Sequence, residues 1–246
     1  MALISVQLWS IQEATKKDFV GSLEEVAKMG YDGVEFAGFG DISAEDMAGH
    51  LNRLGLKASG AHVGVELLRE DLDGVIAYHK TIGNKYIVCP YAKEETKEAW
   101  VALGKELAGY GEKLRANGMA IGYHNHDHEF IEYDGVYAMD LILDQSADTI
   151  AELDTYWTEH AGVDTKAYLD KLGARCPLVH LKDMEIREGG QKISIAYGEG
   201  VLDHKKIINA ALKNNPEWFV IEWEAFDSDC MEAIRISINN LKKLLS

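Results

Sequence analysis

The sequence predicts an α/β protein, a single-domain (β/α)8 (TIM) barrel spanning residues 1–246. Three observations lead to this prediction. Short apolar runs alternate with helical patterns eight times. The chain has 246 residues, and about 250 are typical of such a barrel. Polar residues that can bind metal gather where the apolar runs end.

Eight runs are expected to be strands because each is short, apolar and followed by polar residues or glycine. Their alternation with helical segments predicts a parallel sheet. In chain order they cover residues 3–9, 33–36, 56–62, 86–89, 120–124, 149–154, 178–181 and 218–222.

Helical segments are expected between the strands, because apolar residues recur there every three or four positions. Ser43 begins one of them as an N-cap and Gly55 follows directly after the same segment, while Gly30 follows directly after the segment 19–29. The expected helices cover 19–29, 43–54, 72–82, 95–117, 137–143, 164–172, 205–213 and 231–245. A doubly wound open sheet shows the same alternation, but residues 10–13 lack the glycine-rich turn of a dinucleotide-binding fold.

Composition argues against several classes of partner. The net charge of −16 repels phosphate backbones and anionic lipid, so we expect neither nucleic acid nor a membrane as partner. No run approaches the roughly 18 apolar residues of a membrane span, and the first residues do not resemble a signal peptide. The three cysteines form no C-x-x-C pair, which favours a reducing, cytoplasmic location over a disulfide framework.

Potential metal ligands occupy the ends of several predicted strands, which form the active-site face of such a barrel. A single histidine or aspartate there usually only hydrogen-bonds a loop, so the prediction depends on several occurring together. The outermost inward-facing residues would converge on one metal, and they are His124, Asp154, His180 and Glu222. Mixed nitrogen and oxygen ligands of this kind suit Mn²⁺, Zn²⁺, Co²⁺ or Fe²⁺, whereas Mg²⁺ prefers more oxygen ligands. We expect Mn²⁺, with the other four as alternatives.

Five phrases of the sequence carry a resemblance to a known family. They are 123–126 (YHNH), 153–157 (LDTYW), 180–183 (HLKD), 197–203 and 221–222. With them the chain resembles the xylose-isomerase-like barrel superfamily of sugar phosphate isomerases and epimerases. The resemblance implies a metal held by an acid on strand five and by Asp, His and Glu on the next three strands.

The last three of these ligands map onto Asp154, His180 and Glu222. The chain departs from the ketose 3-epimerases at two positions: strand five offers His124 where they carry Glu, and Trp157 replaces the histidine of a D-x-x-H motif. Glu152 is an alternative ligand to His124.

The resemblance implies a divalent-metal-dependent isomerase or epimerase that moves a proton beside a carbonyl through a metal-stabilised enediolate. Candidates for the acid and base are Glu222, His126 and Lys182. Residues expected to contact the substrate are Trp9, His62, Glu129 and Trp157.

A metal-dependent dehydratase or lyase, acting on an inosose or a 3-keto-glycoside, is the main alternative. An endonuclease IV-like phosphodiesterase and a non-catalytic sugar-binding barrel are further ones, and the negative charge argues against the former. No arginine ends a predicted strand, so we expect an unphosphorylated sugar, inositol or keto-glycoside. The sequence does not indicate an oligomeric state.

Overall fold

Eight parallel strands close into a barrel in the order β1-β12-β9-β8-β5-β4-β3-β2 in this computed structural model, which describes residues 2–225 and 229–246. The first and last strands of the sequence pair with each other, with Ser5 opposite Val220, and this pairing closes the barrel. The strands are β1 (Leu3–Gln7), β2 (Gly33–Phe36), β3 (Lys57–His62), β4 (Tyr86–Cys89), β5 (Ala120–His124), β8 (Ile150–Asp154), β9 (Leu178–Leu181) and β12 (Trp218–Ile221).

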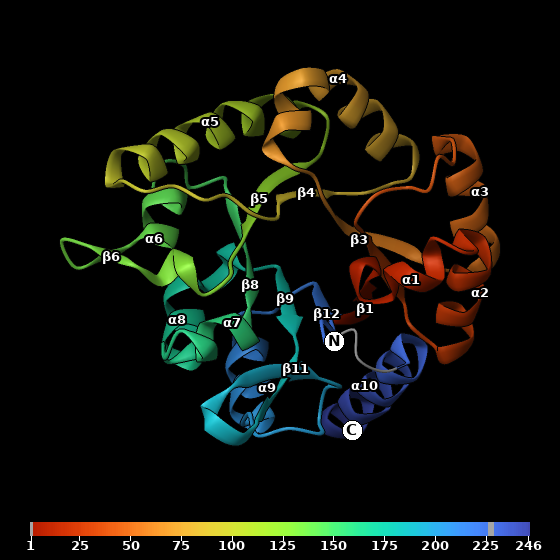
Figure 1. The fold of residues 1–246 in the computed structure, drawn as a ribbon. Helices are drawn as coiled ribbons and strands as arrows, with labels where there is room; N and C mark the ends of the chain where they lie inside the picture. Colours follow the sequence, from red (N-terminus) through yellow and green to blue (C-terminus); the bar gives the residue numbers. More distant parts are fainter. Residues whose placement is uncertain (1, 226–228) are drawn as a thin grey trace.

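Helices surround the strands, as Figure 1 shows in a view into the barrel. No helix in the described part of the chain is long and apolar enough to cross a membrane. The helices are α1 (Gln12–Thr15), α2 (Phe19–Met29), α3 (Ala44–Leu54), α4 (Val65–Thr81), α5 (Lys97–Ala116), α6 (Ala138–Leu143), α7 (Thr155–His160), α8 (Thr165–Leu172), α9 (His204–Lys213) and α10 (Cys230–Leu245).

Local chemistry sets the helix ends where the sequence predicted them. The side chain of Ser43 accepts a hydrogen bond from the backbone N–H of Asp46 and caps α3. Gly30 and Gly55 end α2 and α3 with φ angles of 84° and 69°, a left-handed conformation that a glycine adopts without steric cost.

The barrel interior is apolar at one end and polar at the other. An apolar layer of five side chains packs apart from the main core, and it consists of Tyr86, Val88, Leu178, Trp218 and Val220. Side chains alternate along a strand, so His180 faces the same side as Leu178, and it is in register with Val220. The carboxyl ends of the strands therefore carry their polar groups above an apolar floor.

Several boundaries differ from those that the sequence predicted. The first strand ends at Gln7, and Trp9 lies in a short 3-10 helix, Leu8–Ile11, because the side chain of Gln7 accepts the N–H of Trp9 and turns the chain. Helix α4 begins at Val65 and continues through a non-helical residue at Asp71.

Other elements were not predicted. Helix α7 follows β8 directly, capped by Asp154. Two hairpins also appear, β6 (Glu132–Tyr133) with β7 (Val136–Tyr137), and β10 (Asp183–Ile186) with β11 (Lys192–Ile195). Three further 3-10 helices cover His128–Phe130, Gly173–Arg175 and Glu188–Gly190.

Candidate metal centre and active site

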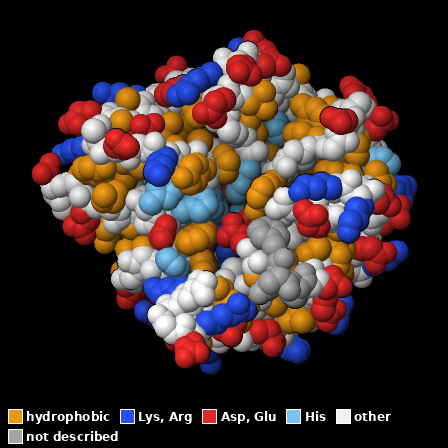
Figure 2. Space-filling model, viewed as in Figure 1, with side chains coloured by type: hydrophobic (Ala, Val, Ile, Leu, Met, Phe, Trp, Pro, Cys, Tyr) orange, Lys and Arg blue, Asp and Glu red, His pale blue; other side chains and the backbone are white. Residues whose placement is uncertain are grey.

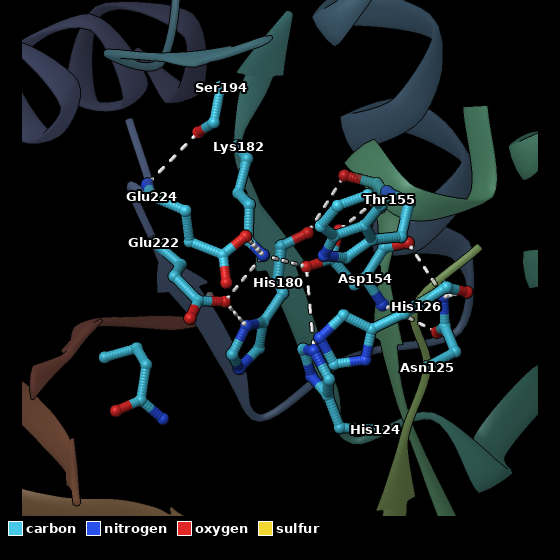
Figure 3. Close-up of polar contacts among 12 residues, drawn as sticks. His124, Asn125, His126, Asp154, Thr155, His180, Lys182, Ser194, Glu222 and Glu224 are labelled. Atoms are coloured by element: carbon cyan, nitrogen blue, oxygen red, sulfur yellow. Dashed lines mark hydrogen bonds and ion pairs between the residues drawn. The ribbon is translucent and has the colours of Figure 1, made fainter. Parts of the chain in front are cut away.

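The carboxyl ends of β5, β8, β9 and β12 bring the four predicted metal ligands together. One donor atom from each of them lies within 4.8 Å of the others, and they are His124, Asp154, His180 and Glu222. Nδ1 of His180 is 2.8 Å from Oε2 of Glu222. Nε2 of His124 is 3.8 Å from Oδ2 of Asp154. All four side chains are buried, and Figure 3 shows them around the end of the barrel.

A second layer of acidic groups lies on the other side of the same histidines. Oε2 of Glu152 lies 2.6 to 3.3 Å from one ring nitrogen of each of three residues, which are His62, His124 and His180. These residues and Glu152 form a second set of donor atoms within 4.8 Å. The two sets share His124 and His180 but use opposite nitrogens of each ring.

Glu35, at the end of β2, completes this lower layer. Its Oε2 is 2.7 Å from Nε2 of His180 and accepts a hydrogen bond of 2.8 Å from Nε2 of Gln7. A carboxylate accepts hydrogen bonds, so the nitrogens that face Glu35 and Glu152 keep their protons. The other nitrogens, Nδ1 of His180 and Nε2 of His124, face Glu222 and Asp154, so a metal held by that set would take the place of a proton there.

Lys182 contributes the fixed positive charge of the site. Its Nζ lies 2.7 Å from Oδ2 of Asp154, 2.9 Å from Oε2 of Glu222 and 2.8 Å from Oε2 of Glu224. Figure 3 shows these carboxylates pointing toward the lysine. Lys182 is fully buried, so its positive charge is compensated by these acids rather than by water.

Electrostatic interactions displace several pKa values. Burial, together with the charge of Glu152, raises the pKa of Glu35 to about 7. Burial alone would lower the pKa of His180, but Glu152 and Glu35 raise it well above its usual value. Burial and the charge of Lys182 lower the pKa of His126 to about 3, so this imidazole is neutral at neutral pH.

The loop after β5 is held by Asn125 and Glu129. Oδ1 of Asn125 accepts a 2.9 Å hydrogen bond from the backbone N–H of Asp154. Oε2 of Glu129 accepts the N–H of His126 at 2.7 Å, and Oε1 accepts the hydroxyl of Tyr123 at 2.8 Å. Glu129 is fully buried, and the structure uses its carboxylate to fix the position of His126.

A cavity of about 460 Å³ opens above the four candidate metal ligands. Among the predicted residues, five contribute to its wall, and they are Trp9, His62, His124, His126 and Glu222. Trp157 borders an adjacent cavity instead, and Glu129 lies behind the wall. Figure 2 shows histidine side chains gathered around the hollow on this face. Trp9 is 43% exposed on this wall.

Sequence reasoning missed two contributors to the site. Glu224 lines the cavity and pairs with Lys182, and Gln7 supports Glu35 from the first strand. A signal existed for both, because each lies two positions from another inward-facing polar residue, Glu222 or Ser5.

The residues present fit a divalent cation. Five carboxylates surround the site: Glu35, Glu152, Asp154, Glu222 and Glu224. Among the described residues, Lys182 is the one lysine or arginine that forms an ion pair with any of them. This excess of buried negative charge, with imidazole nitrogens among the donors, is typical of a site for a transition metal or zinc.

Comparison with known families identifies the fold family. A family model described as the xylose isomerase-like TIM barrel matches residues 23–244. No curated protein matches the chain.

Solved structures share the fold at low sequence identity. A sugar phosphate isomerase/epimerase from Parabacteroides distasonis superposes with a TM-score of 0.84 at 22% identity, over 98% of this chain and 94% of the other. The IolI protein with a bound zinc atom superposes with a TM-score of 0.78 at 18% identity, over 99% of this chain and 98% of the other. The probable 3-DHS dehydratase AsbF from Bacillus anthracis superposes with a TM-score of 0.75 at 12% identity, over 98% of this chain and 99% of the other. The chain belongs to the xylose isomerase-like TIM barrel family.

Proposed function

We propose that this family member is a divalent-metal-dependent isomerase or epimerase that acts on an unphosphorylated sugar or sugar derivative. The observation that carries the proposal is the convergence of four donor atoms at the mouth of the barrel, from His124, Asp154, His180 and Glu222. The family membership and the isomerase/epimerase neighbour support it. We assign Mn²⁺ to the site, with Zn²⁺ as the first alternative because the IolI neighbour holds zinc.

A metal bound by these four residues would supply a Lewis acid that polarises the carbonyl and the adjacent hydroxyl of the sugar. Glu222 contacts His180 and Lys182 through Oε2, so we assign its other oxygen to the substrate proton. His126 lies on the same cavity wall as a neutral imidazole and is the second proton carrier.

Lys182 acts through its neighbours in this proposal. It is fully buried and does not reach the cavity wall, while Glu222 and Glu224, to which it binds, do reach it. The ammonium group therefore fixes the orientation of these two carboxylates. Trp9, in the 3-10 helix after β1, and His62, at the end of β3, would contact the sugar.

Elemental analysis of the purified protein tests the metal site. Wild type is expected to hold about one divalent ion per chain, and Glu222→Gln and His124→Gln to hold much less. His50→Gln on helix α3 is the matched control and keeps the metal. A wild type without stoichiometric metal, or a Glu222→Gln variant with an undiminished content, contradicts the assignment.

Exchange of substrate hydrogen with solvent deuterium then tests the reaction. Ketoses and inososes are the probes, and the proposal expects uptake at the carbon beside the carbonyl that stops when the metal is removed. Binding of these sugars without any uptake would identify a sugar-binding barrel instead.

Elimination is the second candidate, and Glu224 favours it. Burial raises the pKa of Glu224, and its carboxyl group lies on the cavity wall two positions after Glu222. From this position its carboxyl group could act as a general acid that passes a proton to a departing hydroxyl or glycosidic oxygen, while Glu222 takes the proton beside the carbonyl. The dehydratase among the structural neighbours is consistent with this outcome. Elimination forms an unsaturated ketone and isomerisation does not, so the ultraviolet absorbance of that ketone distinguishes the two reactions.

A further inference from the structure

A second cavity, of about 600 Å³, adjoins the one above the four candidate metal ligands. The two cavities share Glu224 as a wall residue. The walls of the second cavity come from three places: helix α7, the β10–β11 hairpin and the segment after β12. The proposed chemistry at the metal uses none of the residues of the hairpin, so this space has no role in it.

The wall of the second cavity carries groups that recognise sugars. Tyr156 and Trp157 supply aromatic surface, and sugar rings pack on such faces. The hairpin adds hydrogen-bonding side chains, which are Arg187, Gln191, Lys192 and Ser194. Two of them are held in place: Lys192 donates to the carbonyl of His160 at 2.8 Å, and Nε of Arg187 lies 3.2 Å from Glu185.

Glu224 and Trp157 form the partition between the two cavities, and Glu224 is hydrogen-bonded on both of its sides. The backbone N–H of Glu224 donates to Oγ of Ser194 in the hairpin at 3.3 Å, while its carboxylate accepts a hydrogen bond from Lys182 at 2.8 Å. The ring of Trp157 lies 5.3 Å from the ring of His126, which borders the first cavity. A ligand that passes this partition would contact the metal-binding side and the hairpin together.

We propose that the second cavity is a subsite for the second ring of a glycoside, whose keto-sugar ring occupies the first cavity. This proposal rests on the proposed function, because it places the reacting ring at the metal. Trp157 would support one face of the second ring, and Gln191 and Arg187 would donate to its hydroxyl oxygens. The substrate class is therefore a keto-glycoside of two rings and not a free monosaccharide.

Steady-state kinetics with two matched probes test the subsite: 3-ketoglucose, and the disaccharide in which that ring is linked to glucose. The disaccharide is expected to have the lower KM. Gln191→Ala and Arg187→Ala should each raise that KM about five- to tenfold, because one hydrogen bond contributes about 1 to 1.5 kcal/mol. They should leave kcat, and both constants for the monosaccharide, unchanged. Arg53→Ala on helix α3 is the control, since its guanidinium pairs with Glu24 at an exposed position.

Equal KM values for the two probes, or equal effects of the variants on both, overturn the subsite while leaving a metal-dependent reaction intact. Calorimetric titration with cellobiose and glucose, neither of which can react through a ketone, gives a readout that is independent of turnover. Tighter binding of cellobiose that Gln191→Ala removes supports the subsite even if the proposed reaction fails. Equal affinities for cellobiose and glucose contradict it.

Discussion

The ammonium nitrogen of Lys182 lies 2.7 Å from Oδ2 of Asp154, and both side chains are fully buried. The lysine contacts Glu222 and Glu224 at similar distances. Burial alone would lower the pKa of Lys182, but these carboxylates raise it well above its usual value, so the charge persists. The site is therefore organised around a permanent cation that belongs to the protein itself.

Replacing Lys182 by Met is expected to lower the free energy of unfolding by about 3 to 5 kcal/mol, because it leaves buried carboxylates without their partner. Urea denaturation in the presence of a chelator measures this loss without a contribution from bound metal. Lys166→Met is the control: its partner Asp170 is exposed, and such a pair contributes less than about 1 kcal/mol. Similar losses in the two variants would show that the buried cluster tolerates the change.

Glu152→Gln is expected to weaken metal binding about 10- to 100-fold without abolishing it. Glu152 accepts hydrogen bonds from the nitrogens of His124 and His180 that face away from the barrel mouth, and so fixes which nitrogen is free to bind. Competition titration with a chromophoric zinc chelator gives the dissociation constant. Glu112→Gln on the exposed face of α5 serves as the control.

A complete loss of metal in Glu152→Gln has a different meaning. It would identify Glu152 as a ligand itself, as the sequence analysis allowed, and would move the ion to the second set of donors. That set contains His62 and Glu152 in place of Asp154 and Glu222.

His79 should make stability depend on pH. Burial lowers its pKa to about 4, while an unfolded histidine titrates near about 6.5. The unfolded chain therefore takes up a proton at higher pH than the folded chain. The contribution of His79 to stability is complete above about pH 6.5 and is lost as the pH falls toward about 4.

The expected loss from this group is about 2 kcal/mol between about pH 7 and about pH 5. His79→Gln removes the titrating group and keeps an acceptor for Nδ2 of Asn84, which lies 3.0 Å from the histidine ring. Urea denaturation of both proteins at the two pH values gives the comparison. An identical pH dependence in wild type and variant would falsify the role of His79.

Gly60→Ala should disturb the lower layer of the site. A Cβ atom at this position would lie 2.5 Å from Oε1 of Glu35, and that carboxylate is held by Gln7 and His180. We expect a loss of about 1 to 3 kcal/mol in unfolding free energy, together with weaker metal binding. Gly49→Ala, in helix α3 with open space around its Cβ, should instead stabilise by up to about 1 kcal/mol. Unfolding curves and zinc titrations of both variants check the pair.

The strands and most helices could be predicted because their signals are local. A run such as Tyr86–Cys89 is apolar on both faces, as a strand buried inside and outside must be, and the caps at Ser43 and Gly30 mark helix ends. A short element escapes prediction when the residue that begins it has been given another role. Helix α7 depends on a single cap by Asp154, a residue that the sequence assigned only to metal binding.

The converging residues could be named from the sequence, but their contacts could not. Strand alternation placed His124, Asp154 and His180 at one end of the barrel. That Glu152 contacts three histidines, and that Lys182 binds three acids, follows from how far each side chain extends across the barrel, which no spacing encodes. Trp9 and Glu129 were predicted to contact the substrate only because they lie at or near the end of a predicted strand. Glu129 is fully buried in the structure.

The pairing of β1 with β12 has a consequence during protein synthesis. Strand β1 leaves the ribosome before the other strands of the barrel, yet its partner β12 begins only at Trp218. For most of translation, one side of the nascent sheet therefore offers unpaired N–H and C=O groups that can bind another chain. Contacts over so long a stretch of sequence also form slowly. We therefore expect newly made chains to depend on chaperones, and misassembly to decrease sharply once β12 is free to pair.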